Sequence, residues 1–103
     1  MPHQNREELL RRIQAYLTDL RGNDPQVAFE SAREIVNLQS KSATRALIAI
    51  ARHADKPHSR RFAIFALRQL RDRRSLNVLA ECTNVKNPPE IRDEAVEALG
   101  WFV

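Results

Sequence analysis

The residues best suited to chemistry in this sequence are three histidines and a single cysteine. His53 and His58 lie five residues apart, and His3 and Cys82 are far from both. This arrangement lacks the ligand spacing of a zinc site. The two glycines are also far apart, so the sequence contains no glycine-rich phosphate loop. We therefore predict no catalytic activity, no metal and no other cofactor.

Positive charge is concentrated in the middle of the chain. The net charge of the 103 residues is +4, but residues 41–74 contain ten Lys or Arg against two Asp, a local net charge of +8. Residues 1–40 have a net charge of −1, and residues 75–103 have a net charge of −3. This distribution favours a negatively charged partner, either an acidic protein or peptide surface or a phosphate backbone.

Several of these basic residues recur at helical spacing. The set at i, i+4, i+7 and i+11 is Lys41, Arg45, Ile48 and Arg52, and the equivalent set further along the chain is Arg73, Asn77, Ala80 and Asn84. The spacing places each set on one face of a helix, which predicts a basic and polar binding surface. The alternative, which is more common for a run of charges, is a solvated face that only keeps the chain soluble. Binding that weakens steeply with salt would favour the first interpretation.

A thirty-two-residue repeat organises the chain. Pro25, Pro57 and Pro89 mark the repeat at equal intervals, and small or apolar residues keep the same offset. The aligned sets are Ser31, Ala63 and Ala95; Ile35, Leu67 and Leu99; and Leu38, Leu70 and Phe102. Within one repeat these positions are spaced i, i+4, i+7, so they lie on one face of a helix. Self-similarity at this period predicts a solenoid of stacked helices.

We predict six helices and no strands. The expected ranges are 5–21, 25–38, 42–54, 58–70, 73–84 and 89–102, with Asp24, Asp72 and Asn87 as possible N-caps. The first helix lies outside the repeat register, so we expect it to pack on Phe29 and Val36 and to cap the stack. The expected single domain consists of this capping helix (1–24), two repeats (25–56 and 57–88) and a half repeat (89–103).

Two segments, SRRFAIFALRQLRDRRSLNVLAE at 59–81 and IRDEAVEALG at 91–100, resemble the HEAT-like repeat of the phycobilisome-lyase type. The matching residues are Arg60, Ala63, Ala66, Leu67, Asp72, Arg74 and Leu79 in one repeat, and Arg92, Ala95, Ala98, Leu99 and Gly100 in the next. The first repeat departs from the pattern, with Ala28 in place of the Arg and Ser40 in place of the turn Asp. The resemblance covers residues 25–103. It implies an all-α, right-handed α-solenoid of about two and a half HEAT-like helical hairpins behind the N-terminal capping helix.

The resemblance also implies roles for particular residues. The second helices of HEAT repeats line the concave side, so the two basic and polar sets would form a groove there. The Arg near the start of a first helix, Arg60 or Arg92, is structural in this family and reaches an acidic group in the preceding turn. For Arg60 that group would be Asp55. A basic recognition pair is the alternative role for the two arginines.

Aromatic residues interrupt the repeat. Phe62 and Phe65 stand where the neighbouring repeats have charged residues, and Trp101 stands where they have Asn37 and Gln69. If these positions face outwards, the three aromatic residues form a patch of the kind found at interfaces. Burial by a tilted packing of the helices is the alternative.

Other features concern location and self-association. The single Cys82 aligns with Ile50, so we expect a small buried hydrophobe in a cytoplasmic protein rather than a disulfide or a nucleophile. The N-terminus is charged where a signal peptide is apolar, and no apolar run could span a membrane, so we expect no membrane partner. The apolar C-terminal end around Phe102 could allow two chains to associate.

These features predict a non-catalytic protein-binding or adaptor module, including an inhibitor or immunity-type factor, that contacts an acidic protein. One alternative is a HEAT-like domain that binds nucleic acid, although no aromatic residues interleave with the basic set as base stacking requires. Another is a non-catalytic subunit or fragment of a larger HEAT-repeat enzyme complex, such as a chromophore lyase. No residue of this sequence can be assigned to that chemistry.

Overall fold

The computed structural model describes residues 2–102, and every regular element in this range is helical. The helices are α1 (Pro2–Leu20), α2 (Pro25–Asn37), α3 (Thr44–His53), α4 (Pro57–Leu70), α5 (Leu76–Cys82) and α6 (Pro89–Gly100). Two short 3-10 turns, η1 (Lys41–Ala43) and η2 (Arg73–Ser75), lead into α3 and α5. The prediction of six helices without strands is confirmed for the described residues, and the 3-10 turns form the starts of the predicted third and fifth helices.

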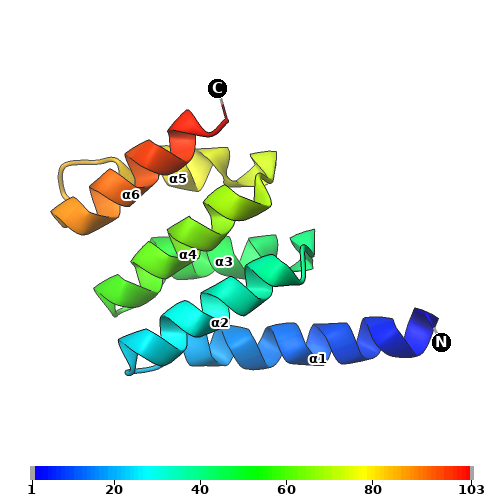
Figure 1. The fold of residues 1–103 in the computed structure, drawn as a ribbon. Coiled ribbons are helices and arrows are strands. Elements are labelled where there is room, and N and C mark those ends of the chain that lie inside the picture. Colours follow the sequence, from blue (N-terminus) through cyan, green and yellow to red (C-terminus); the bar gives the residue numbers. More distant parts are fainter. Residues whose placement is uncertain (1, 103) are drawn as a thin grey trace.

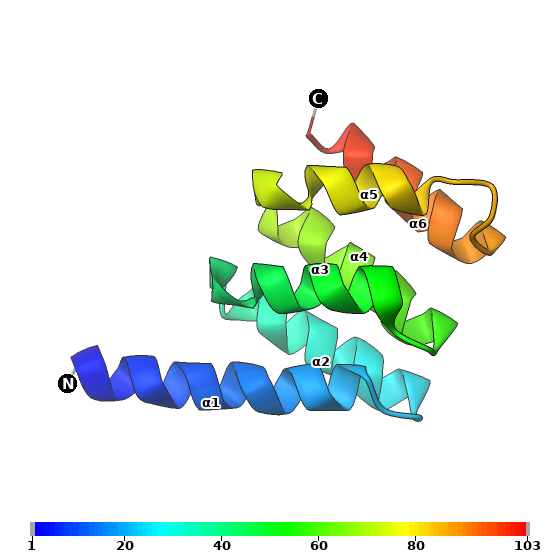
Figure 2. The same cartoon turned by 180° about the vertical axis from the view of Figure 1, so that it is seen from behind.

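The helices form two layers. Helices α2, α4 and α6 lie side by side in one layer (Figure 1), and α1, α3 and α5 form the other, which is seen from the reverse side (Figure 2). Across the layers, α1 packs against α2, α3 against α4 and α5 against α6, and within one layer α4 packs against both α2 and α6. This stack of hairpins is an α-solenoid. The prolines that mark the repeat stand at the starts of α2, α4 and α6. The hairpins of α3 with α4 and of α5 with α6 therefore each contain the second helix of one sequence repeat and the first helix of the next.

Short polar side chains fix the starts of the helices. The carboxylate of Asp24 accepts hydrogen bonds from the backbone N–H groups of Gln26 and Val27 and so caps α2. Ser40 and Asp72 occupy equivalent positions in successive repeats, and they cap η1 and η2 by accepting from the N–H two residues later. The predicted caps Asp24 and Asp72 are therefore confirmed. In the first repeat, which lacks the turn Asp, Ser40 forms the equivalent cap.

Asn87 does not cap α6, because its side chain is used within the preceding loop. Its amide nitrogen donates to the carbonyl oxygens of Glu81 and Cys82 at 3.3 and 3.2 Å. Its side-chain oxygen accepts a hydrogen bond from Arg60 of α4 at 2.8 Å. The predicted cap was wrong, and α6 begins after Pro88 without a side-chain cap.

One residue with a left-handed backbone conformation lies in each of the connections from α2 to η1 and from α4 to η2. Gln39 follows α2 with a φ of 50°, and Arg71 follows α4 at the equivalent position with a φ of 53°. Few residues other than glycine adopt this conformation, which turns the chain sharply at the C-terminal end of a helix. The same geometry at both places sets η1 and η2 in equivalent positions.

The aligned apolar positions form the core. Ile35 and Leu67 of one layer and Leu47 and Leu79 of the other have no exposed surface. Cys82 is buried among them, and desolvation raises the pKa of its thiol. The interpretation of Cys82 as a small core residue is confirmed.

Helix α1 is joined to the stack by both apolar and polar contacts. Ile13 and Leu17 are buried, and the hydroxyl of Ser59 in α4 donates to the carbonyl oxygen of Leu20 at 2.6 Å. Phe29, which we expected to pack on α1, places its ring 5.2 Å from the ring of Phe62 in α4.

Candidate functional site

The predicted basic and polar residues gather on the layer that contains α3 and α5. Lys41 and Arg45 belong to η1 and α3, Arg73 and Asn77 belong to η2 and α5, and all four are exposed. We call these four residues the basic face. Because α3 and α5 pack against one another, the two predicted sets lie on neighbouring helices (Figure 2).

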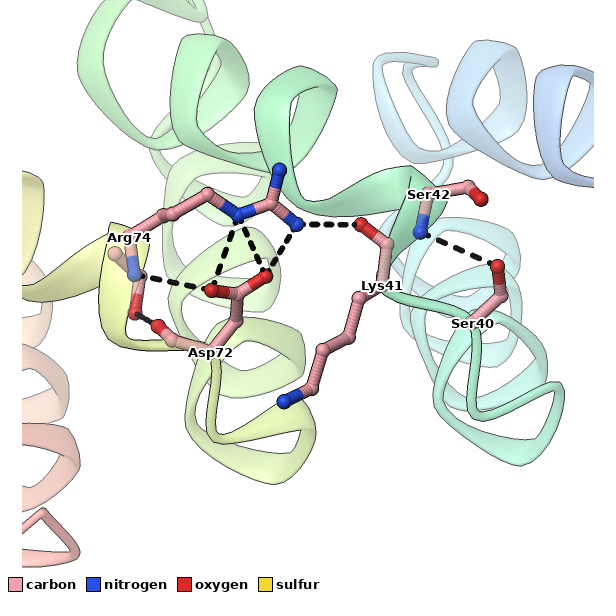
Figure 3. A network of polar contacts seen from close by, with 6 residues as sticks. Ser40, Lys41, Ser42, Asp72 and Arg74 are labelled. Atoms are coloured by element: carbon pink, nitrogen blue, oxygen red, sulfur yellow. Dashed lines mark hydrogen bonds and ion pairs between the residues drawn. The ribbon is translucent and has the colours of Figure 1, made fainter.

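A polar network joins the starts of these two helices (Figure 3). Arg74 donates from Nε to Oδ2 of Asp72 at 2.9 Å and from Nη2 to the backbone carbonyl of Lys41 at 3.1 Å. Asp72 is buried and also accepts from the backbone N–H of Arg74 at 3.0 Å. The hydrogen bonds from Arg74 hold the pKa of the Asp72 carboxyl well below its usual range. The network fixes the backbone of Lys41 beside η2, the turn that carries Arg73.

A second cross-link joins α3 to α5 further along. Arg52 donates from Nε to Oε2 of Glu81 at 3.1 Å, and its Nη2 contacts the same oxygen. Both side chains are substantially exposed, so the pair adds little to stability. It does compensate the charge of Arg52, which we had predicted as a binding residue. In the structure Arg52 links two repeats rather than adding free charge to the basic face.

The three positive charges of the basic face are not compensated by acidic side chains. Among the residues whose side chains the structure describes, Lys41, Arg45 and Arg73 have no carboxylate at ion-pair distance. Three cations on two cross-linked helices create a positive potential that attracts acidic groups.

The three predicted aromatic residues lie in two groups on either side of Arg68. Phe62 and Phe65 are partly buried, and their rings lie 5.2 and 5.6 Å from the ring of Phe29. Trp101 is 43% exposed. The guanidinium of Arg68 lies between the two groups, 5.4 Å from the ring centre of Phe65 and 5.0 Å from that of Trp101. A role of these aromatic residues in partner binding stays a prediction, for which Trp101 is the most accessible.

Arg68 is the residue that the sequence interpretation missed. Its side chain is only 11% exposed, and it pairs with Glu94 at 3.5 Å and Glu97 at 3.0 Å. A charged residue at a position where the neighbouring repeats have Val36 and Gly100 was the signal in the sequence. Its function is to join α4 to α6 through ion pairs and ring contacts.

Arg60 has the structural role that the family resemblance implied, but its partners differ. It donates from Nε to the carbonyl of Ala51 and from Nη2 to Asn87, both at 2.8 Å. The prediction that Arg60 reaches Asp55 was wrong. Arg92 occupies the equivalent position in α6, and its Nε is buried without a hydrogen-bond partner among the described residues.

The described residues meet the requirements of neither a metal site nor a membrane-spanning helix. No cluster of three His, Cys, Asp or Glu side chains there could hold a metal ion. A ring nitrogen of His58 lies 2.9 Å from the carbonyl oxygen of Gly22, so this histidine helps to hold the turn after α1. None of the described helices combines the length and apolar character that a membrane span requires.

Comparison with known protein families identifies the type of repeat. Residues 13–100 match the family described as HEAT repeats. The chain belongs to the HEAT-repeat family. The match begins within α1, so it extends further towards the N-terminus than the resemblance over residues 25–103. It does not single out the phycobilisome-lyase type. No curated protein matches the sequence.

Membership of the HEAT-repeat family bears on function at a general level. HEAT repeats are commonly scaffolds for protein interactions, and the fold is generally non-catalytic. Stacked repeats present extended surfaces that are held rigid by their neighbours. In this HEAT-repeat protein, the basic face brings three uncompensated cations together on two cross-linked helices.

Proposed function

We propose that this HEAT-repeat protein is a non-catalytic protein-binding module whose basic face contacts an acidic surface of a partner protein. The observation that carries the proposal is the exposure of Lys41, Arg45 and Arg73 without carboxylate partners on two cross-linked helices. Adaptor, inhibitor and complex-subunit roles all use such a contact, and the identity of the partner decides among them.

The cross-links favour binding because they hold the backbone of the face in place before a partner arrives. The Arg74 contact with Lys41 and the Arg52 pair with Glu81 join α3 to α5 at two places. A prearranged surface loses less conformational entropy on association, so more of the interaction energy contributes to affinity. Attraction between exposed charges also raises the association rate and is screened by salt.

The experiment compares two charge-matched double variants. Fluorescence anisotropy of a fluorescein-labelled, glutamate-rich peptide measures binding over a series of salt concentrations. Lys41→Glu/Arg73→Glu should weaken binding by about tenfold or more and flatten its salt dependence. Arg33→Glu/Lys86→Glu changes the net charge equally at exposed sites on α2 and in the α5–α6 loop, and it should have little effect. Equal losses in both variants, or binding by the native protein that is independent of salt, would rule out the basic face.

The same assay with a labelled single strand of DNA tests the nucleic-acid alternative. Aromatic side chains contribute strongly to the binding of single strands, and the basic face contains none. We expect weak DNA binding with no preference over the peptide. Tighter binding of DNA, with a steep salt dependence that is lost in Lys41→Glu/Arg73→Glu, would show that the basic face binds nucleic acid instead of a protein.

We also propose weak self-association through the outer side of α6. Val96 is 60% exposed, whereas Ile64, its equivalent in α4, is fully buried. Leu99 on the same side of α6 is partly buried, while its equivalent Leu67 is fully buried. An apolar surface that resembles an inter-repeat contact can pack against a second copy of the chain.

A further inference from the structure

A pocket of about 360 Å³ lies beside the basic face, where α2 and α4 end. Its lining residues are Val36, Gln39, Lys41, Gln69 and Leu70. Lys41 therefore belongs both to this pocket and to the basic face. The volume is at the small end of the range for ligand pockets, about 300–1,000 Å³, which suits one inserted side chain rather than a large ligand.

The walls of the pocket combine apolar and polar groups. Val36 and Leu70 supply an apolar surface that is packed against the core. Gln39 and Gln69 supply side-chain amides, and Lys41 supplies a positive charge. A pocket with both apolar and polar walls can bind an apolar anchor and orient its polar neighbours.

The geometry of the pocket is fixed by backbone contacts on both sides. The N–H of Gln39 donates to the carbonyl of Val36 at 2.9 Å, which closes the left-handed turn. Arg74 holds the carbonyl of Lys41, and the Lys41 side chain extends away from the Arg74 guanidinium (Figure 3). The pocket thus exists before a ligand arrives, which reduces the entropic cost of binding.

The next repeat indicates what fills such a space. There the equivalents of Val36, Gln39 and Gln69 are Arg68, Arg71 and Trp101. The Trp101 ring lies 5.0 Å from the guanidinium of Arg68 and 5.3 Å from that of Arg71. The ring of Trp101, directly after α6, therefore covers the positions that correspond to Val36 and Gln39, whereas Gln69 of α4 leaves the pocket open.

We propose that this pocket receives one aromatic side chain from an acidic segment of the partner. The inserted ring lies over Val36 and Gln39, as Trp101 lies over Arg68 and Arg71. Carboxylates next to the aromatic residue then pair with Lys41 and Arg73, which the Arg74 network holds close together. This inference rests on the proposed function of the basic face and specifies the partner as an acidic peptide segment with an aromatic anchor.

The test uses two fluorescein-labelled peptides that are rich in glutamate and differ only in a central Trp or Ala. The native protein should bind the Trp peptide about tenfold more tightly than the Ala peptide, as expected for a buried aromatic anchor. Gln69→Trp fills the pocket from within, so it should remove this difference while the affinity for the Ala peptide stays the same. Lys41→Glu/Arg73→Glu should weaken the binding of both peptides.

A second measurement does not depend on a variant that must fold. A peptide with benzoylphenylalanine in place of the Trp should, on irradiation, cross-link to residues 36–41 or 69–70 of the native protein. Equal affinities for the Trp and Ala peptides, or cross-links confined to other residues, would overturn the anchor pocket while salt-dependent binding of both peptides keeps the basic face. Failure of both peptides to bind at low salt would overturn the proposed function and the anchor together.

Discussion

The guanidinium of Arg74 donates a hydrogen bond to the backbone carbonyl of Lys41, 33 residues away in the sequence, at 3.1 Å. The same group neutralises Asp72, whose side chain caps η2. One buried carboxylate therefore orients an arginine that holds two repeats together at the edge of the basic face. Removing the carboxylate should loosen both the turn and the contact between repeats.

The first prediction concerns the substitution Asp72→Asn. It should lower the free energy of unfolding at neutral pH by about 1–3 kcal/mol, because hydrogen bonds to an ionised group are replaced by weaker neutral ones. Urea unfolding followed by circular dichroism measures the change. Asp93→Asn, at an exposed site on α6, is the control and should change stability by less than about 0.5 kcal/mol.

The effect of Asp72 should depend on pH. The pKa of its carboxyl is lowered in the folded state, so below about pH 4 the unfolded chain binds a proton that the folded chain does not. The stabilisation is complete above the unfolded-state pKa and decreases as the pH falls towards the lower folded-state pKa. The difference in stability between the native protein and Asp72→Asn should therefore shrink in acid. A difference that stays constant down to low pH would contradict the role of this ion pair.

The second prediction concerns Arg68, which combines ion pairs with ring contacts. Arg68→Lys keeps the charge but loses the planar group, so it should destabilise the fold by about 1–2 kcal/mol, and Arg68→Ala by about 2–4 kcal/mol. Chemical unfolding measures both changes. A double-mutant cycle with Trp101→Ala should give a coupling energy above about 0.5 kcal/mol. Additive effects would show that the contact with Trp101 contributes nothing.

The third prediction concerns the thiol of Cys82. Because it is buried and its pKa is raised, it should not react with Ellman's reagent in the native protein and should react fully in urea. Cys82→Val should be tolerated better than Cys82→Ser, because the serine hydroxyl would be desolvated at this buried position. Rapid labelling under native conditions would indicate that α5 opens readily.

The fourth prediction concerns Val96. Light scattering of the native protein should give an apparent mass that rises with concentration, and Val96→Glu should keep the mass of a monomer. Val85→Glu introduces the same charge at an exposed site in the α5–α6 loop and should leave the association unchanged. A native mass that is independent of concentration would exclude the outer side of α6 as a contact between copies.

Contacts between residues close in the sequence were predictable, whereas contacts between distant residues were not. Asp24 and Asp72 were identifiable as caps because a cap contacts its own chain two or three residues later. Asn87 has the same capacity, but its side chain is used by Arg60, 27 residues away. From the sequence alone, Asn87 could either cap α6 or bind a distant side chain. The packing of α4 against the loop before α6 determines that it binds Arg60.

The aromatic residues illustrate the same limit. Alignment of the repeats correctly marked Phe62, Phe65 and Trp101 as exceptions, but not their neighbours. The separation of Trp101 from the phenylalanines depends on Arg68, and the ring contacts of Phe65 depend on Phe29 in the preceding repeat. Such contacts depend on how neighbouring helices are rotated and shifted, which the spacing within one helix does not determine.

The sequence by itself determined the repeat, the helices and most of the core, because the period of the repeat and the i, i+4, i+7 spacing act through local geometry. Only the tertiary structure decided which charges remain available. Among the described residues, Arg52 is compensated by Glu81 of the next repeat, while Lys41, Arg45 and Arg73 have no carboxylate at ion-pair distance. The physical reason is that an ion pair between repeats requires two side chains to meet across a helix interface, and only the packing brings them within reach.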